Sequence, residues 1–317
     1  MKKKNIVVIA GGCGGAKTIR ALYPLQEKVQ VSAVVPMSDS GRSTGVLRKR
    51  FSVVPPSDIM RVTLAMTQYD YETVRNIFHK TRFRDSGPLQ NYYLGNLFLA
   101  WSFAQTQDFL CGLRALHEVV NAYGKTLPST LSLTDLCASL ADGQELIGEH
   151  VVDRPNKNQQ ARIVRSWLNP KAIIYSEAKN AIEQADYILL GPGSLYTSII
   201  ATLLVDGMQE AIRNSKAKII YIAGNTYEIK GECGPKVLSS AIDELEQYVP
   251  KKIDTVIYCT ATDTKDMIEK YKKREIALLK YDKENLTGRV VVAKDFARYE
   301  TGGLCAEKLS HILNTVI

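Results

Sequence analysis

The sequence is poor in histidine, and its cysteines are not paired. The four histidines, at positions 79, 117, 150 and 311, lie too far apart for the spacing of a structural zinc site. The six cysteines, at 13, 111, 137, 233, 259 and 305, include no C-x-x-C pair. This pattern predicts reduced thiols in a reducing compartment, and it predicts no metal cluster held by the protein.

Long apolar runs are also missing. No run approaches the roughly 20 residues that a membrane-spanning helix needs. The basic start, residues 1–4, resembles the start of a signal peptide, but the apolar run behind it, residues 6–10, is far too short. We therefore expect a cytoplasmic protein without a membrane span.

Charge is the next constraint on function. Forty-one Lys and Arg against 33 Asp and Glu give a net charge of +8, with basic runs at residues 48–50 and 270–274. Such runs are most often solvated helix faces, although a basic surface also attracts anionic metabolites. The interleaved aromatic residues of an RNA-binding sheet are absent. The charge thus favours a small anionic ligand over nucleic acid.

Apolar runs that alternate with amphipathic segments predict the fold class. Short Val- and Ile-rich runs predict buried strands at 5–10, 29–35, 171–175, 187–190, 217–223, 253–259 and 290–293. Helical patterns occupy residues 16–23, 57–67, 71–80, 93–104, 109–123, 176–185, 194–214, 234–247, 265–274 and 305–313. Strands followed by helices predict a single α/β domain over 1–317, with a doubly wound, mainly parallel Rossmann-like sheet and helical insertions.

Residues 128–168 interrupt this rhythm. Short apolar stretches at 131–133, 145–152 and 161–168, joined by polar turns, predict a small β excursion within the domain.

The first strand is followed by G-G-C-G-G, residues 11–15. Lys17 and Thr18 resemble the end of a P-loop, but Ala16 replaces its last glycine, and the Rossmann spacing fails at Lys17. We expect Lys17 and Thr18 to begin the first helix. A tight structural turn is one interpretation of the glycines. The other is a loop that lets the backbone approach a ligand phosphate at the carboxyl edge of the sheet.

Two further stretches lie at the predicted carboxyl edge. D-S-G-R-S-T-G, residues 39–45, follows the second strand, where Asp39 is suited to a ribose hydroxyl or a metal, or else to capping a helix. G-P-G-S-L-Y-T-S, residues 191–198, follows the strand at 187–190 and offers hydroxyls to phosphate oxygens, or else caps a buried helix. Asn225 follows another strand, and Asn96 lies in a weaker G-N-L motif.

These motifs together resemble the YvcK/CofD family. The resemblance rests on G-G-C-G-G, on D-S-G-R-S-T-G-V-L-R at 39–48, on P-P-S-D at 55–58, on L-G-N-L at 94–97, on L-P-S-T at 127–130, on D-G-Q-E-L-I-G-E at 142–149 and on G-P-G-S-L-Y-T-S-I-I at 191–200. The chain departs from the family pattern where Gly14 replaces a threonine and Ser40 replaces the second aspartate of a pair.

The resemblance implies a YvcK-type regulatory protein that binds a UDP-sugar or a dinucleotide and is linked to carbon metabolism and cell shape. Its implied ligand-binding residues are Gly11, Gly12, Gly14, Gly15, Asp39, Ser43, Thr44, Asn96, Gly191, Gly193, Ser194, Thr197 and Asn225. It implies no required cofactor. The alternative is a phospho-group transferase like CofD, with Asp39 catalytic and Mg²⁺ bound. The sequence leaves open whether the chain is an enzyme and whether it forms a homo-oligomer.

Overall fold

Apolar strands form the centre of the molecule in a computed structural model, which describes residues 2–261, 265–273, 275–299 and 303–317. Across the sheet the strands are β12 (Val291–Lys294), β10 (Thr255–Cys259), β8 (Lys218–Ala223), β7 (Tyr187–Leu190), β1 (Lys4–Ile9), β2 (Val29–Val35) and β3 (Lys125–Pro128). All neighbouring strands run parallel. The chain builds outward from β1 in one direction and then from β7 in the other, which confirms the predicted doubly wound α/β fold.

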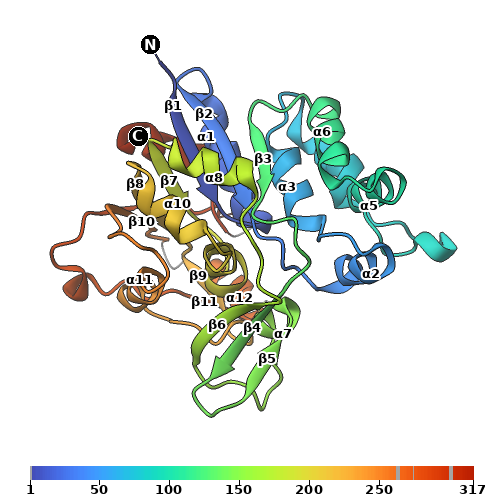
Figure 1. Cartoon of the computed structure of the whole chain (residues 1–317). Coiled ribbons are helices and arrows are strands. Elements are labelled where there is room, and N and C mark those ends of the chain that lie inside the picture. The colour runs from blue at the N-terminus through green and yellow to red at the C-terminus, as the bar shows by residue number, and fades with distance from the viewer. Residues whose placement is uncertain (1, 262–264, 274, 300–302) are drawn as a thin grey trace.

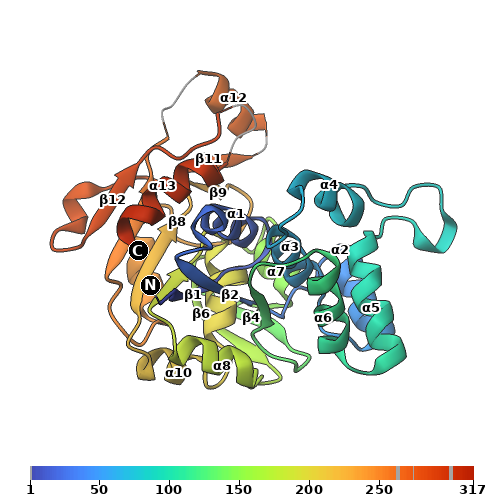
Figure 2. The same cartoon turned by 90° about the horizontal axis from the view of Figure 1, so that it is seen from above.

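Two cores cover the two faces of this sheet because strand side chains alternate. Ile6 and Val8 of β1 belong to one core, and Val7 and Ile9 belong to the other. The first core includes α1 (Gly12–Leu22), α3 (Ser57–Ala65), α5 (Leu94–Thr106), α6 (Phe109–Val119) and α13 (Ala306–Val316). The second includes α8 (Ser176–Glu183), α10 (Met208–Asn214) and α11 (Leu238–Glu246). Figure 2 shows α1 and α13 on one side of the sheet and α8 and α10 on the other.

A small antiparallel sheet lies at the lower end of the molecule in Figure 1. Its order is β5 (Glu145–Ile147), β4 (Asp135–Leu140) and β6 (Ile163–Asn169). The strand predicted at 131–133 is wrong, and β4 follows it instead. The strand predicted at 145–152 stops early, because Gly148 adopts a φ of 99° and begins α7 (Glu149–Asp153).

The remaining elements lie outside these two groups of helices and the two sheets described so far. They are α2 (Arg42–Phe51), α4 (Tyr71–Arg75), α9 (Ala201–Leu203), α12 (Lys265–Lys273), β9 (Thr226–Glu228), β11 (Ile276–Leu278), the π-helical η2 (Asn76–Lys80) and η4 (Leu195–Ile200), and the 3₁₀ turns η1 (Tyr23–Leu25), η3 (Gly87–Leu89) and η5 (Lys283–Leu286). Among the described residues, no helix has both the length and the apolar content to cross a bilayer.

Several predicted boundaries are wrong. The first helix begins at Gly12 rather than Ala16. The helix predicted at 194–214 is interrupted, because Gly207 adopts a φ of 89° before α10. The stretch 171–175 forms only one bridge, between Ile173 and Asp206. The sequence also suggests Ser176 as the cap of the helix at 176–185, but α8 begins with Ser176 itself, after Tyr175, and no side-chain hydrogen bond caps it.

Candidate ligand-binding cleft

The centre of the sheet contains a topological switch point. β1 and β7 are neighbours, and the chain continues from β1 to β2 on one side and from β7 to β8 on the other. Doubly wound sheets bind ligands outside the carboxyl ends of the strands at such a point. Residues 11–15 follow β1, and residues 191–193 follow β7, where Gly191 N–H donates to the Ile9 carbonyl over 2.9 Å. The structure therefore brings two of the predicted loops together.

Gly14 is the point of closest approach between these loops. A β-carbon at this position would lie 2.0 Å from the carbonyl oxygen of Pro192. That atom belongs to the backbone, so no rotation of a side chain could relieve the overlap. The absence of a side chain at Gly14 is thus a packing requirement of the cleft in this protein.

Lys17 and Thr18 have separate roles on α1. The Thr18 hydroxyl donates to the Gly191 carbonyl over 3.1 Å and holds the loop at 191–193 against residues 11–15. Lys17 lines the cavity described next, and burial lowers the pKa of its ammonium group, with Arg298 adding to the effect. Among the described residues, Lys17 forms no ion pair. A desolvated cation with no ion pair to any described residue is suited to an anionic ligand.

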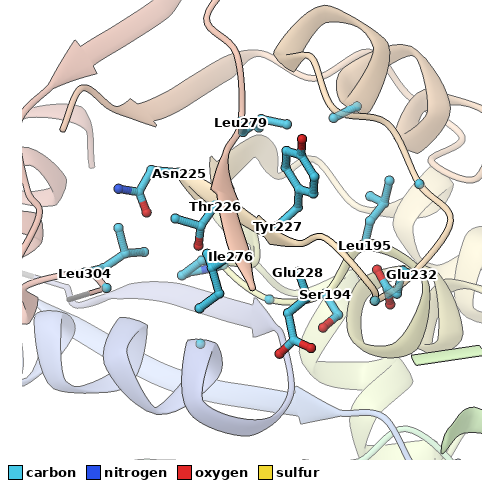
Figure 3. A pocket seen from close by; sticks show the side chains of 18 of the residues that line it. Ser194, Leu195, Asn225, Thr226, Tyr227, Glu228, Glu232, Ile276, Leu279 and Leu304 are labelled. Carbon is cyan, nitrogen blue, oxygen red and sulfur yellow. The ribbon is translucent and has the colours of Figure 1, made fainter. Parts of the chain in front are cut away.

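A cavity of about 300 Å³ opens beside the two loops. The antiparallel strands β9 and β11 form one wall of this cavity. Figure 3 shows the side chains of Asn225, Ser194 and Glu228 around it. The Asn225 side chain is only 2% exposed, yet its Nδ2 has no hydrogen-bond partner among the described residues. A buried amide without a partner costs about 1–3 kcal/mol, so this group is suited to a ligand acceptor.

Carboxylates line the cavity as well as Lys17. They belong to Asp153, Glu228 and Glu232. Burial raises the pKa of Glu232 to about 7, although hydrogen bonds from Thr197 oppose this. Burial also raises the pKa of Asp153. These three residues are not among the predicted site residues, because Asp153, Glu228 and Glu232 all lie outside the motifs of the sequence.

The predicted loop at residues 39–45 lies close to two further buried carboxyl groups, those of Asp58 and Glu149. Burial raises the pKa of Asp58 to about 6, and the charge of Asp39 raises it further, while Arg61 lowers it. Asp58 contacts the first glycine loop, since a β-carbon at Gly11 would lie 2.5 Å from its Oδ2. Burial, with Asp39 and Asp153, raises the pKa of Glu149 to about 9. Asp58 was visible in P-P-S-D, but that motif alone was too weak to identify it.

Glu149→Gln is expected to change how stability depends on pH. The Glu149 pKa is raised from 4.5 to about 9 in the folded protein, so the folded state binds more protons than the unfolded state between these values. Wild-type unfolding free energy should therefore fall as pH rises from about 4.5 to about 9. The unfolding free energy of the variant should fall less steeply with pH than that of the wild type, as measured by urea unfolding at several pH values, while Glu232 and Asp58 keep their own contributions in both proteins. Identical slopes would show that Glu149 titrates normally.

The carboxylates near Asp39 do not form a metal cage. Among the described residues, no three His, Cys, Asp or Glu side chains are arranged to hold a metal ion. Asp39 Oδ1 already accepts a hydrogen bond from Gly41 N–H over 2.9 Å, and Ser40 supplies no second carboxylate. This donor set does not fit the Mg²⁺ that the resemblance to CofD implies, and no chemistry is derived from such an ion.

Cationic and aromatic side chains lie on the other side of the first loop. Arg61 Nε donates to His79 Nε2 over 2.7 Å, and burial together with Arg61 lowers the pKa of His79 to about 3. His79 packs on Tyr93, and the Arg82 guanidinium lies 4.1 Å from the centre of the same ring. Arg82 also donates to the Ser43 hydroxyl over 3.3 Å. The predicted loop at residues 39–45 is therefore linked through Ser43 to the cluster of Arg61, His79, Arg82 and Tyr93.

The predicted site residues are distributed over the cleft. Those that line the cavity are Gly14, Gly193, Ser194 and Asn225. Those outside its lining are Gly11, Gly12, Gly15, Asp39, Ser43, Thr44, Asn96, Gly191 and Thr197. Thr44 and Thr197 are buried in α2 and η4. Asn96 is 1% exposed, and neither atom of its amide has a hydrogen-bond partner among the described residues.

Comparisons with known proteins agree with this architecture. Residues 6–297 match the family described as 2-phospho-L-lactate transferase CofD. The putative gluconeogenesis factor of Thermotoga maritima is 32% identical over 287 residues, which cover 90% of this chain and 88% of that protein. The gluconeogenesis factor of Bacillus subtilis is also 32% identical, with the same coverage of both chains.

Solved structures give the same result. A crystal structure of a Bacillus halodurans protein has a TM-score of 0.89 and 30% identity, covering 99% of this chain and 100% of that one. A second crystal structure of the same protein, described there as a member of the UPF0052 family, has a TM-score of 0.88 and 28% identity, covering 99% of each chain. The chain belongs to the CofD family, and its relatives there are gluconeogenesis factors.

Proposed function

We propose that the chain binds a diphosphate-containing nucleotide, such as a nucleotide sugar, in the cavity beside the two glycine loops. It acts as a regulatory binding protein linked to carbon metabolism and cell shape, in the manner implied by its resemblance to the YvcK-type proteins. The main observation in support is the buried Nδ2 of Asn225, which has no hydrogen-bond partner among the described residues and belongs to a residue that lines the same cavity as Lys17. A cytoplasmic location and the oligomeric state stay predictions.

The lining of the cavity favours a ligand that carries both an anionic group and hydroxyl groups. Lys17 offers one cation beside the backbone of Gly14 and Gly193, where a diphosphate can approach closely. Carboxylates such as Glu228 accept hydrogen bonds from hydroxyls, which nucleotides and sugars carry in number. A ligand with a diphosphate at one end and hydroxyls at the other matches both ends of this cavity.

A transferase is the second candidate. The pKa of Asp58, raised to about 6, brings this carboxyl group near the pH at which a general base works best. Asp39, the catalytic residue expected for a transferase, raises that pKa. Phosphoryl-type transfer depends mostly on positioning and charge, so it needs no separate nucleophile in the protein.

A thermal-stability screen tests the proposal. The protein is heated with UDP-glucose, NAD, GDP or duplex DNA, with and without Mg²⁺. A nucleotide at 100 times its dissociation constant should stabilise the fold by about 2.7 kcal/mol. A shift with DNA alone would overturn the proposal. Release of the nucleoside product in the presence of an alcohol acceptor would favour the transferase.

Asn225→Leu should weaken ligand binding without lowering the stability of the fold. Loss of the amide removes the ligand contact, so affinity for UDP-glucose should fall at least about tenfold, the equivalent of one hydrogen bond at about 1.4 kcal/mol. Stability should change little, because the substitution removes a buried Nδ2 that has no hydrogen-bond partner among the described residues. Calorimetric titration and urea unfolding measure the two effects. Asn180→Leu, on the exposed surface of α8, is the control and should change neither.

A further inference from the structure

The carboxylate of Glu232 occupies the start of the helix that follows the second glycine loop. Its Oε1 accepts a hydrogen bond from Thr197 N–H over 2.7 Å, and its Oε2 accepts one from Tyr196 N–H over 3.3 Å. These N–H groups belong to the first turn of η4, which continues into α9 as one helix from Leu195 to Leu203. N–H groups in a first turn have no partner within the helix and bind anions.

A ligand phosphate would need the same groups. Ser194, Gly193 and Glu232 all line the cavity, so the N–H groups that Glu232 holds lie at its edge. Asn225, with its buried and unpartnered Nδ2, lines the same cavity and independently indicates a ligand there. A carboxylate and a phosphate oxygen compete for the same donors, and both are acceptors of charge-assisted hydrogen bonds.

We propose that Glu232 is a placeholder for the ligand: it holds the N–H groups of Tyr196 and Thr197 in the free protein, and a phosphate of the bound nucleotide replaces it. This inference rests on the proposed function and adds a mode of regulation to it. The affinity of the site is reduced by the chain's own carboxylate, and any change that neutralises or withdraws Glu232 opens the anion site.

Protonation is one such change. Among the described residues, the titratable groups around Glu232 include Asp153 from α7, Glu228 from β9, Tyr221 from β8, Tyr196 from η4 and the neighbouring Cys233, and Lys17 lines the same cavity from α1. Burial and the charge of Asp153 raise the pKa of Glu232 to about 7. Below this pH the neutral acid holds the N–H groups less strongly and does not repel a phosphate, so binding should tighten as pH falls from 8 to 6.

Glu232→Gln tests the placeholder. UDP-glucose is a suitable probe because its diphosphate stays fully ionised between pH 6 and 8. At pH 8 the variant should bind UDP-glucose about tenfold more tightly than the wild type, since a neutral amide competes less well than a carboxylate. Wild-type affinity should fall between pH 6 and 8, and the variant's affinity should stay nearly constant. Glu232→Ala, which removes the acceptor altogether, should behave in the same way.

Glu228→Gln is the matched control. Glu228 lines the same cavity but makes no hydrogen bond to Tyr196 or Thr197, so its variant should keep the wild-type dependence on pH. If Glu232→Gln and Glu232→Ala bind UDP-glucose no more tightly than the wild type, with an unchanged dependence on pH, the placeholder is wrong while the proposed function stands.

A second measurement tests the anion site even if the protein does not bind a nucleotide. Inorganic pyrophosphate at pH 8 should shift the backbone amide NMR signals of Tyr196 and Thr197 in Glu232→Gln more strongly than in the wild type. If these signals shift but UDP-glucose binds to neither protein, the anion site stands and the nucleotide function fails. If neither probe binds to any variant, both proposals fail.

Discussion

Gly14→Ala is expected to lower the free energy of unfolding by about 3 kcal/mol, the upper range for overpacking a well-packed site. The added methyl group would lie 2.0 Å from the Pro192 carbonyl oxygen, so the two glycine loops must separate. Because these loops border the cavity, separation should also remove nucleotide binding. Urea unfolding measures the first effect, and titration with UDP-glucose measures the second.

Gly224→Ala is the control for this substitution. Gly224 also lines the cavity, but the nearest atom to its added β-carbon is 3.9 Å away, an ordinary contact. Its stability should therefore stay within about 0.5 kcal/mol of the wild type. If Gly14→Ala is as stable as Gly224→Ala, the close approach of the two loops is not a feature of the folded protein.

Lys17→Met should reduce affinity for UDP-glucose by about 100-fold, or close to 3 kcal/mol, because a buried charge loses its partner in the complex. Stability should not fall. Burial lowers the pKa of Lys17, which means that folding desolvates the ammonium group at a cost, and the described residues provide no carboxylate in an ion pair with it. Calorimetric titration should thus show weaker binding of UDP-glucose, and thermal unfolding should show a stability equal to or higher than that of the wild type.

A lysine elsewhere provides the comparison. Lys28 is exposed, and its Nζ donates to Asn314 Oδ1 over 3.1 Å, far from the cavity. Lys28→Met should leave affinity unchanged. Equal losses in Lys17→Met and Lys28→Met would indicate a general effect of net charge rather than a contact in the cavity.

The sequence was sufficient to predict six of the seven strands of the central sheet. β2 and β7 have the predicted bounds, because their apolar runs are short, rich in Val, Ile and Leu, and clearly bounded. β3 was missed, since K-T-L-P is too short and ends in a proline. β9 and β11 were missed because each has only three residues and pairs with a strand far away in the sequence. Their pairing depends on tertiary contacts that periodicity does not show.

The candidate site was predictable only where it follows strand ends. Gly14, Gly193, Ser194 and Asn225 come shortly after the ends of β1, β7 and β8, so the rule for parallel sheets was enough to group them. Glu232 could not be grouped with them. It lies on the connection between β9 and α11, and only the folded chain brings it to the N–H groups of η4.

Asp58 shows the same limit. An aspartate in the first turn of a helix is ordinary, because its charge is favourable there. Its unusual feature is burial against the first glycine loop together with the nearby charge of Asp39, and both arise from the packing of α3 on α1. A pKa raised by burial has no signature in the order of residues along the chain.

A crystal structure of the protein with UDP-glucose tests the central claim most directly. We predict electron density for the nucleotide in the cavity lined by Gly14, Gly193 and Asn225, with the diphosphate within hydrogen-bond distance of the Lys17 ammonium group. Density for a nucleotide bound elsewhere on the molecule, or an empty cavity at a saturating concentration, would contradict the account.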